Sequence, residues 1–472
     1  MKEKKEAGKT SKLKERLLME KPRVWDSISE QDKQAVKDYA EGYKEFLNAA
    51  RTERKCVSVF LDMARENGFK DIFQSDQSDS KVYFNSRGKL LALAVMGSEP
   101  VTEGVRIVTS HIDSPRLDLK PNPLYEDLGL AMLKTHYYGG IKKYQWVARS
   151  LAMVGTIVRH DGEVVEIEIG IDPKDPVITI PDLLPHLSRK QMEQKASEFI
   201  PAENLNVIIA GTPYEDKDAS DRVKLAALEL LNNKYGITEE DFVSSEIEIV
   251  PADAVRDAGL DRSMVAGYGQ DDRVCAFTSV TALMSAEKPS HTAIAICYDK
   301  EEIGSEGNTS AKSFALETFL YELLEKTGLE PSQRNIRKIF TSGKALSGDV
   351  TAAVDPTYSE MYEKRNNSRI GHGIGITKYT GSGGKYMGSD ANAEYASWVR
   401  RLFNESQVVW QTAGLGKVDE GGGGTVAKYL ANAGIDIIDC GPPILGMHSP
   451  FELCAKDDIW MCFKAYRAFL SS

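Results

Sequence analysis

The fold is decided by residues 291–305, which read HTAIAICYDKEEIGS. The run Thr292–Tyr298 is short and apolar, which predicts a buried strand. Helical patterns lie on both sides of it, over Val274–Ala286 and Ala311–Lys326, and a further strand is predicted around Ile339. More units of this kind continue to the C-terminus, so the sequence predicts an α/β sheet covered by helices.

Upstream of residue 291, the sequence first has helical and strand patterns and then becomes β-rich. Residues 31–67 have the apolar spacing of a helix, and strands are predicted at Leu90–Met96 and Val105–Thr109. Between residues 117 and 252 the pattern becomes β-rich. There, residues 155–170 alternate apolar and polar side chains around an Asp-Gly turn, which is typical of a hairpin.

The length of the chain predicts two domains. At 472 residues it exceeds the usual size of one hydrophobic core. The simplest arrangement is a discontinuous α/β domain over residues 1–116 and 253–472, built on a helix-covered mixed sheet. A β-rich domain over residues 117–252 is predicted to be inserted into it.

The composition excludes several functional classes. Apolar residues make up 42% of the chain and charged residues 27%, without an apolar run long enough to span a bilayer. The formal net charge is -11, and no basic stripe is present to neutralise phosphates. We therefore expect a soluble protein whose partner is neither a membrane nor a nucleic acid.

The N-terminus and the cysteines both predict a cytoplasmic protein. Residues 1–22 form a basic, polar arm that leads into a first helix and lacks the apolar segment of a secretory signal. Cysteines are few for this length and never form a CxxC pair, so we expect buried free thiols in a reducing compartment. They are Cys56, Cys275, Cys297, Cys440, Cys454 and Cys462.

Side chains suited to metal binding follow the predicted strands. An apolar strand that begins at Val105 ends in His111-Ile-Asp113 and a proline, and a strand end presents an imidazole rigidly. Asp113 lies two residues on and points to the same side, where its carboxylate could orient the ring. A structural role for His111 is the alternative.

Glu301 and Glu302 are harder to explain structurally. Two carboxylates at the end of a buried strand are costly to hold unless they are paired, protonated or bound to a cation. The alternative is a solvated turn with both charges pointing outward. More acidic groups occur at Asp271-Asp272, where aspartate could simply cap a helix, and at Asp349 after another strand.

His448 lies in a loop beyond a strand, ahead of an amphipathic closing helix. Together with His111, two aspartates and one glutamate, it completes a ligand set for two divalent ions that share one aspartate. Imidazole and carboxylate ligands without thiolate suit zinc, with cobalt or manganese as alternatives. The remaining glutamate would take a proton from water and pass it to a leaving amine. Since one metal can also hold a free α-amine, an exopeptidase follows.

Five motifs carry a resemblance to a known family. They are SHIDSPRLDLKP (110–121), GQDDR (269–273), DKEEIGS (299–305), SGD (347–349) and MHSP (447–450). In this order they resemble the aspartyl aminopeptidase and vacuolar aminopeptidase I family of dinuclear zinc peptidases, and the likeness covers nearly the whole chain. It implies a metalloaminopeptidase that hydrolyses the N-terminal peptide bond of short peptides, with a preference for Asp or Glu at the N-terminus.

The resemblance also implies a role for each motif residue. One zinc ion would be held by His111, Asp271 and Asp349, and the other by Asp271, Glu302 and His448. Glu301 would be the general base, and Asp113 would orient His111. Family members usually form tetrahedral dodecamers, so a homo-oligomer is implied, in which the domain at 117–252 pairs subunits and restricts the site to short peptides.

Some positions depart from the family pattern. Ala352 and Asp355 stand where eukaryotic members have histidines, and Tyr144 stands where they have a histidine lent to a neighbouring active site. Acidic, neutral and broad specificity therefore all stay open. Lys378 matches a family lysine near the substrate, with Lys385 as a second candidate for an acidic side chain; either could instead be a surface charge.

Three other functions remain as alternatives. A carboxypeptidase or N-deacylase could use the same two-metal chemistry and would differ in whether it needs a free amine. A non-catalytic assembly protein would have no reason to keep every ligand and the glutamate base. A nucleotide-dependent enzyme would need a phosphate-binding loop, which the sequence lacks.

Overall fold

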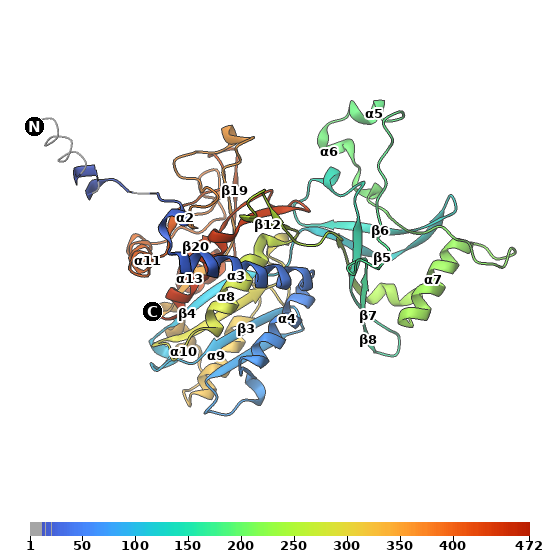
Figure 1. Ribbon diagram of the computed structural model, residues 1–472. Helices are drawn as coiled ribbons and strands as arrows, with labels where there is room; N and C mark the ends of the chain where they lie inside the picture. Colours follow the sequence, from blue (N-terminus) through green and yellow to red (C-terminus); the bar gives the residue numbers. More distant parts are fainter. Residues whose placement is uncertain (1–11, 15, 20) are drawn as a thin grey trace, which may run out of the picture.

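A computed structural model describes residues 12–14, 16–19 and 21–472, and it folds them into two lobes (Figure 1). Residues 1–11, 15 and 20 of the polar N-terminal arm predicted for residues 1–22 lie outside the described residues. The short helix α2 (Val24–Ser27) follows that arm, and its Val24 N–H donates to Gly371 O at 2.9 Å.

The larger lobe is built on a nine-stranded sheet. In spatial order its strands are β1 (Lys70–Asp71), β2 (Lys81–Ser86), β3 (Leu90–Val95), β13 (Thr292–Tyr298), β4 (Val105–His111), β14 (Lys344–Ser347), β20 (Asp436–Gly441), β16 (Ile374–Thr377) and β18 (Trp410–Thr412). The four central strands β13, β4, β14 and β20 are parallel, whereas β3 and β16 run antiparallel to them. The carboxyl ends of the parallel strands therefore meet at one edge, where α/β folds place their sites.

Helices cover both faces of this sheet, as expected for an α/β fold. One face carries α3 (Glu30–Ala49), α4 (Glu53–Glu66), α8 (Gln270–Met284), α11 (Ala393–Glu405) and α13 (Lys456–Leu470). The other carries α9 (Ala315–Lys326), α10 (Gln333–Ser342) and α12 (Ala427–Ala433). The predicted fold class is confirmed. Within the described residues, none of the helices is both long enough and apolar enough to cross a membrane.

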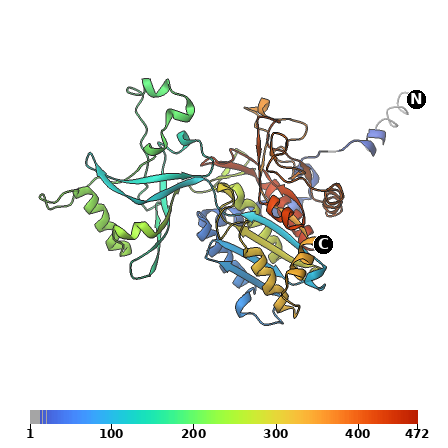
Figure 2. The same ribbon diagram turned by 180° about the vertical axis from the view of Figure 1, so that it is seen from behind.

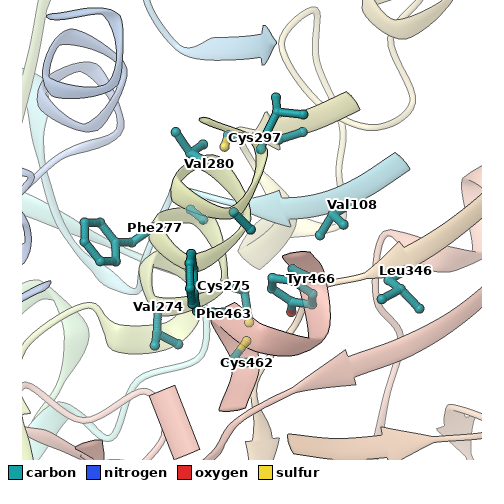
Figure 3. Packing of buried hydrophobic residues seen from close by; sticks show 14 of the residues in the cluster. Val108, Val274, Cys275, Phe277, Val280, Cys297, Leu346, Cys462, Phe463 and Tyr466 are labelled. Carbon is teal, nitrogen blue, oxygen red and sulfur yellow. The ribbon is translucent and has the colours of Figure 1, made fainter. Parts of the chain in front are cut away.

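The core of the first face lies between α8, α13 and the sheet. Figure 3 shows Cys275 of α8 and Cys462 of α13 with their sulfur atoms facing each other, beside Tyr466. Val108 of β4 and Leu346 of β14 belong to the same cluster. All six cysteines are buried and free, which confirms the expected thiols. This packing fixes the N-terminal end of α8 against the edge of the sheet where β4 ends.

The smaller lobe contains a six-stranded antiparallel sheet, and all of its strands lie between Arg116 and Pro251. In spatial order they are β8 (Val164–Ile169), β7 (Leu151–Val158), β10 (Ser245–Pro251), β5 (Arg116–Asp127), β6 (Leu130–Tyr138) and β9 (Val207–Ala210). The hairpin expected over residues 155–170 is formed by β7 and β8. Helix α7 (Arg222–Tyr235) packs on β5, β6 and β9, while α5 (Arg189–Met192) and α6 (Ala196–Phe199) belong to the light-green segment at the top of this lobe in Figure 2.

A third, five-stranded sheet links the start of α8 to the C-terminal region. Its order is β11 (Arg256–Ala258), β12 (Met264–Gly267), β22 (Glu452–Ala455), β21 (Pro443–Leu445) and β15 (Thr351–Ala352). Gly267 pairs with Glu452 across β12 and β22, so the loop before β22 lies beside the residues that open α8. A small pair, β17 (Gly381–Ser382) and β19 (Gly422–Gly423), lies apart from this sheet.

One local prediction is wrong. Ile339 lies in helix α10 and not in a strand, because Ser332 caps that helix and Ile336, Ile339 and Phe340 share its buried face. The helical pattern over residues 31–67 is confirmed, but it is divided into two helices, since the side chain of Thr52 accepts from Lys55 N–H and starts α4 anew.

Candidate metal centre

The candidate ligands come from strand ends and from loops that neighbouring strands hold together. His111 is the last residue of β4 and pairs in register with Tyr298, the last residue of β13. The turn of 3-10 helix Glu301–Ile303 follows β13, and Asp349 lies two residues beyond β14. Asp271 lies at the start of α8, and His448 lies between β21 and β22. Segments far apart in the sequence therefore meet at one edge of the central sheet.

Asp271 lies between two imidazoles. Its Oδ1 is 3.3 Å from His111 Nε2, and its Oδ2 is 3.3 Å from His448 Nε2. His448 Nε2 is also 3.3 Å from Glu302 Oε2. A carboxylate that faces one histidine with each oxygen has the arrangement that a bridging ligand needs.

Asp113 holds one side of this centre. Its Oδ1 accepts from the backbone N–H of Glu301 and its Oδ2 from that of Glu302, both at 3.1 Å. His111 Nδ1 lies 3.3 Å from the same carboxylate and 3.0 Å from the Asp113 carbonyl oxygen. Tyr138 completes the set, donating its hydroxyl to Oδ2 at 2.8 Å. Asp113 thus contacts both the His111 imidazole and the backbone of the glutamate pair, while His111 Nε2 faces Asp271.

Glu452 holds the other side and was not anticipated from the sequence. Its Oε1 accepts from His448 N–H at 2.9 Å, and its Oε2 accepts from Gln270 N–H at 2.7 Å and Asp271 N–H at 3.2 Å. The residue is 1% exposed, and burial raises its pKa to about 8. The sequence did contain one sign of this role: Glu452 lies in the strand-like run Glu452–Ala455, and a charge in a buried strand is costly unless it is paired.

A second group of carboxylates surrounds Asp271. Ligand atoms of Asp271, Asp272 and Asp349 lie within 4.8 Å of one another, as do those of His111, Asp271 and Glu302. Asp272 does not cap α8: its Oδ2 accepts from His111 N–H at 3.2 Å. Burial, and then the charge of Asp272, raise the pKa of Asp349 well above its usual value.

The donor set fits divalent cations. Asp271 Oδ1, Asp272 Oδ1 and Glu302 Oε1 are buried and have no hydrogen-bond partner among the described residues. Buried carboxylate oxygens that converge without donors are strongly unfavourable unless positive charge lies between them. Imidazole nitrogens and carboxylate oxygens, without a thiolate, are ligands that zinc prefers.

The pKa shifts agree with a site that attracts positive charge. Burial would lower the pKa of His448, but Asp271 and Glu302 outweigh it and raise that pKa to about 10. Burial raises the pKa of Glu301 to about 7 and that of Glu302 well above its usual value. A cation bound beside Glu301 and Glu302 would stabilise their ionised form, which burial disfavours.

The candidate substrate lysine lies outside this cluster. Lys378 Nζ donates to Asp390 Oδ1 at 2.8 Å and to the Ala391 carbonyl oxygen at 2.9 Å. Lys385 Nζ binds the other oxygen of Asp390 at 2.6 Å. Lys378 has no hydrogen bond or ion pair with any of the predicted metal-site residues in the part of the chain that the structure describes. Tyr144 lies in a short 3-10 helix of the smaller lobe with 49% of its surface exposed.

Comparison with known proteins gives consistent matches over most of the chain. The family model described as "Aminopeptidase I zinc metalloprotease (M18)" matches residues 46–470. A probable M18 family aminopeptidase 1 of Borrelia garinii is 46% identical over 458 residues, covering 96% of this chain and 99% of the relative.

Solved structures agree with these matches. The crystal structure of an M18 family aminopeptidase from Thermotoga maritima has a TM-score of 0.92 and 44% identity, covering 96% of this chain and 99% of that one. The S. cerevisiae mApe1 dodecamer has a TM-score of 0.73 at 19% identity, covering 92% of this chain and 96% of that one, which shows a shared fold. The expected family is confirmed: this chain is an aminopeptidase of the M18 family of zinc metalloproteases.

Proposed function

We propose that the chain is a two-metal aminopeptidase whose ions share Asp271. His111, Asp271 and Asp349 would hold one ion, and Asp271, Glu302 and His448 the other. The observation that carries the proposal is the position of Asp271: each of its oxygens lies 3.3 Å from a different imidazole nitrogen, and Oδ1 has no hydrogen-bond donor. Two zinc ions are the proposed occupants, with Co²⁺ or Mn²⁺ as functional substitutes.

Glu301 is the proposed general base. The ions, when bound, supply a water of lowered pKa and polarise the scissile carbonyl. Glu301 takes the proton of that water and delivers it to the leaving amine. Two features support this role: its backbone is fixed by Asp113 at 3.1 Å, and burial raises its pKa to about 7, close to the operating pH of a base.

The peptide is proposed to enter with a free α-amine. Of the specificities left open, the ion pairs at Asp390 favour a neutral or broad preference over an acidic one. Both Lys378 and Lys385 already bind that aspartate, so neither is a free cation for an Asp or Glu side chain. A carboxypeptidase or N-deacylase remains the runner-up within the same chemistry.

We further propose a cytoplasmic homo-oligomer, built through the domain at residues 117–252, with a dodecamer as the expected size. The similar yeast chain is described as a dodecamer. Apolar side chains are exposed on this domain in numbers that favour burial against another subunit. They include Leu183, Leu184, Leu187, Met192, Leu225 and Leu230.

The proposal is tested with peptides that differ only at the amino end. Initial rates are measured for Asp, Glu, Leu, Ala and Lys dipeptides and their N-acetylated forms, using protein that has been chelated and then reloaded with zinc, cobalt or manganese. The expected result is metal-dependent release of the first residue from free-amine peptides only. Cleavage of the acetylated forms at equal rates would instead support the deacylase or carboxypeptidase alternative.

A further inference from the structure

The smaller lobe reaches the metal centre through the end of strand β6. Tyr138, the last residue of that strand, donates its hydroxyl to Asp113 Oδ2 at 2.8 Å. Two residues later, the Gly140 carbonyl oxygen accepts from His448 Nδ1 at 2.9 Å. The short segment at the end of β6 therefore contacts Asp113, which faces His111, and His448 itself.

Glycines permit this close approach. Gly139 has a φ of +70°, and a Cβ there would lie 3.4 Å from Glu302 Cβ. A Cβ on Gly140 would lie 3.2 Å from His448 Nδ1, closer than ordinary contact. A side chain at Gly140 would therefore crowd His448, whereas one at Gly139 would strain the left-handed backbone.

The effect on the two imidazoles is the same. Each has its Nδ1 tied to an acceptor and its Nε2 directed at Asp271. A hydrogen bond at Nδ1 fixes the ring orientation and leaves Nε2 free to bind a metal. For His448 the acceptor is Gly140 itself, whereas for His111 the lobe acts through Asp113.

A buried charge cluster holds Tyr138 in place. The Arg116 guanidinium lies over the Tyr138 ring, 3.9 Å from its centroid. Arg116 in turn lies 3.5 Å from Glu53 on α4 of the larger lobe and 3.2 Å from Glu248 on β10 of the smaller lobe. All three charged residues are buried, so the position of Tyr138 depends on how the two lobes are joined.

We propose that Tyr138 is a positioning residue, through which the six-stranded sheet holds Asp113, and with it His111 and the Glu301-Glu302 turn, in the geometry that binds metal. The smaller lobe is then part of the metal centre as well as a surface for assembly. This inference rests on the proposed two-metal function.

The test compares two tyrosines that are adjacent on β6. Tyr138→Phe removes only the hydroxyl that reaches Asp113, and Tyr137→Phe removes a hydroxyl from a neighbour that is 41% exposed. For the full-length oligomer, zinc affinity is measured by chelator competition, kcat and KM are separated, and the visible spectrum of the cobalt-loaded protein is recorded. Loss of an outer hydrogen bond of this kind typically weakens metal binding by about 10–100-fold.

We expect Tyr138→Phe to weaken zinc binding by about tenfold, lower kcat more than it raises KM, and alter the cobalt spectrum, while Tyr137→Phe changes none of these. In an Asp113→Asn background, Tyr138→Phe should add no further loss, because the acceptor is already altered. Parental zinc affinity in Tyr138→Phe, equal losses in both variants, or a lower melting temperature with unchanged affinity would each overturn the inference. A parent protein without zinc or peptidase activity would instead refute the proposed function.

Discussion

The two histidines of the metal centre are held in different ways. His111 is 2% exposed, ends a central strand and has a carboxylate behind it. The His448 side chain is 35% exposed, lies in a loop with a φ of 64°, and has only a backbone carbonyl behind it. One side of the site belongs to the core of the sheet, and the other to a loop that two lobes hold together. We infer that the His111 side is rigid before metal binds, and that the His448 side is the more open of the two.

The largest effect on turnover is expected for a substitution of Glu301, the proposed general base. Glu301→Gln should lower kcat by about 10²–10⁴-fold, because the amide cannot take a proton from water. Metal content should stay at the parental level, since Glu301 is not among the proposed ligands. Near-parental turnover in this variant would show that another group is the base. The measurement pairs steady-state kinetics with elemental analysis.

The histidines themselves give the most direct contrast. His111→Ala removes the imidazole that lies between the buried carboxylates of Asp113 and Asp271, so the metal-free protein should lose about 3 kcal/mol of unfolding free energy. His448→Ala, at a side chain that is 35% exposed, should lower that free energy by less than His111→Ala does, yet both variants should lose zinc. Denaturant unfolding with chelator, compared with metal content, separates the two effects. Equal losses of stability would contradict the distinction between a rigid and an open side.

Glu452 tests whether the open side depends on its carboxylate. Glu452→Gln replaces one accepting oxygen by a donor that faces a backbone N–H, and zinc affinity should fall by about 10–100-fold. Gln411→Glu, at another buried polar position in the same lobe, serves as a control for general disturbance of the fold. An unchanged zinc affinity in Glu452→Gln would show that the Glu452 carboxylate is not needed to hold the His448 side of the site.

The His448 side should contribute to the pH dependence of metal binding. In the metal-free protein the pKa of His448 is raised to about 10, above its ordinary value. Its proton therefore stabilises the fold fully below about pH 6.5, and this stabilisation is lost as the pH rises toward 10. Zinc competes with the same proton, so its affinity should increase between pH 6.5 and 8.5 by up to about tenfold per unit for each proton displaced. In His448→Ala the slope should decrease; a parental slope there would assign the proton to another group.

The smallest effect is expected at Lys378, outside the metal centre. Because its Nζ is already bound to Asp390, Lys378→Ala should change the ratio of rates on Asp and Leu dipeptides by less than about threefold. A tenfold fall in the Asp rate alone would restore Lys378 as a substrate residue and favour the acidic preference. Lys385→Ala is the matched control, since it removes the other partner of the same aspartate.

Sequence patterns could predict much of the fold and the identity of the clustered side chains. The strand ending in His111 and the strand before Glu301 were predictable, because apolar runs that end in charged residues have few purely structural explanations. Parallel strands then bring such ends to one edge. The strand expected around Ile339 failed because an apolar spacing of three and four residues is helical, and here Ser332 supplies the cap.

Glu452 and Tyr138 could not be predicted from local patterns in the same way. The carboxylate of Glu452 reaches Asp271 because β22 pairs with β12, a contact between segments far apart in the chain. Tyr138 reaches Asp113 because the register of β5 and β6 places it opposite Arg116, three residues after Asp113. Neither strand pairing nor its register follows from a local pattern of residues. Contacts of this kind determine how the proposed ligands are held, whereas His111, Glu302 and Asp349 could be proposed from the apolar strands that they end or follow.

The central claim is that Asp271 bridges two metal ions, and anomalous diffraction at the zinc edge tests it most directly. A crystal of the zinc-loaded protein should give two peaks per chain: one among His111, Asp271 and Asp349, and the other among Asp271, Glu302 and His448. A single peak, or a pair of peaks that does not contact Asp271 from both sides, would contradict the account.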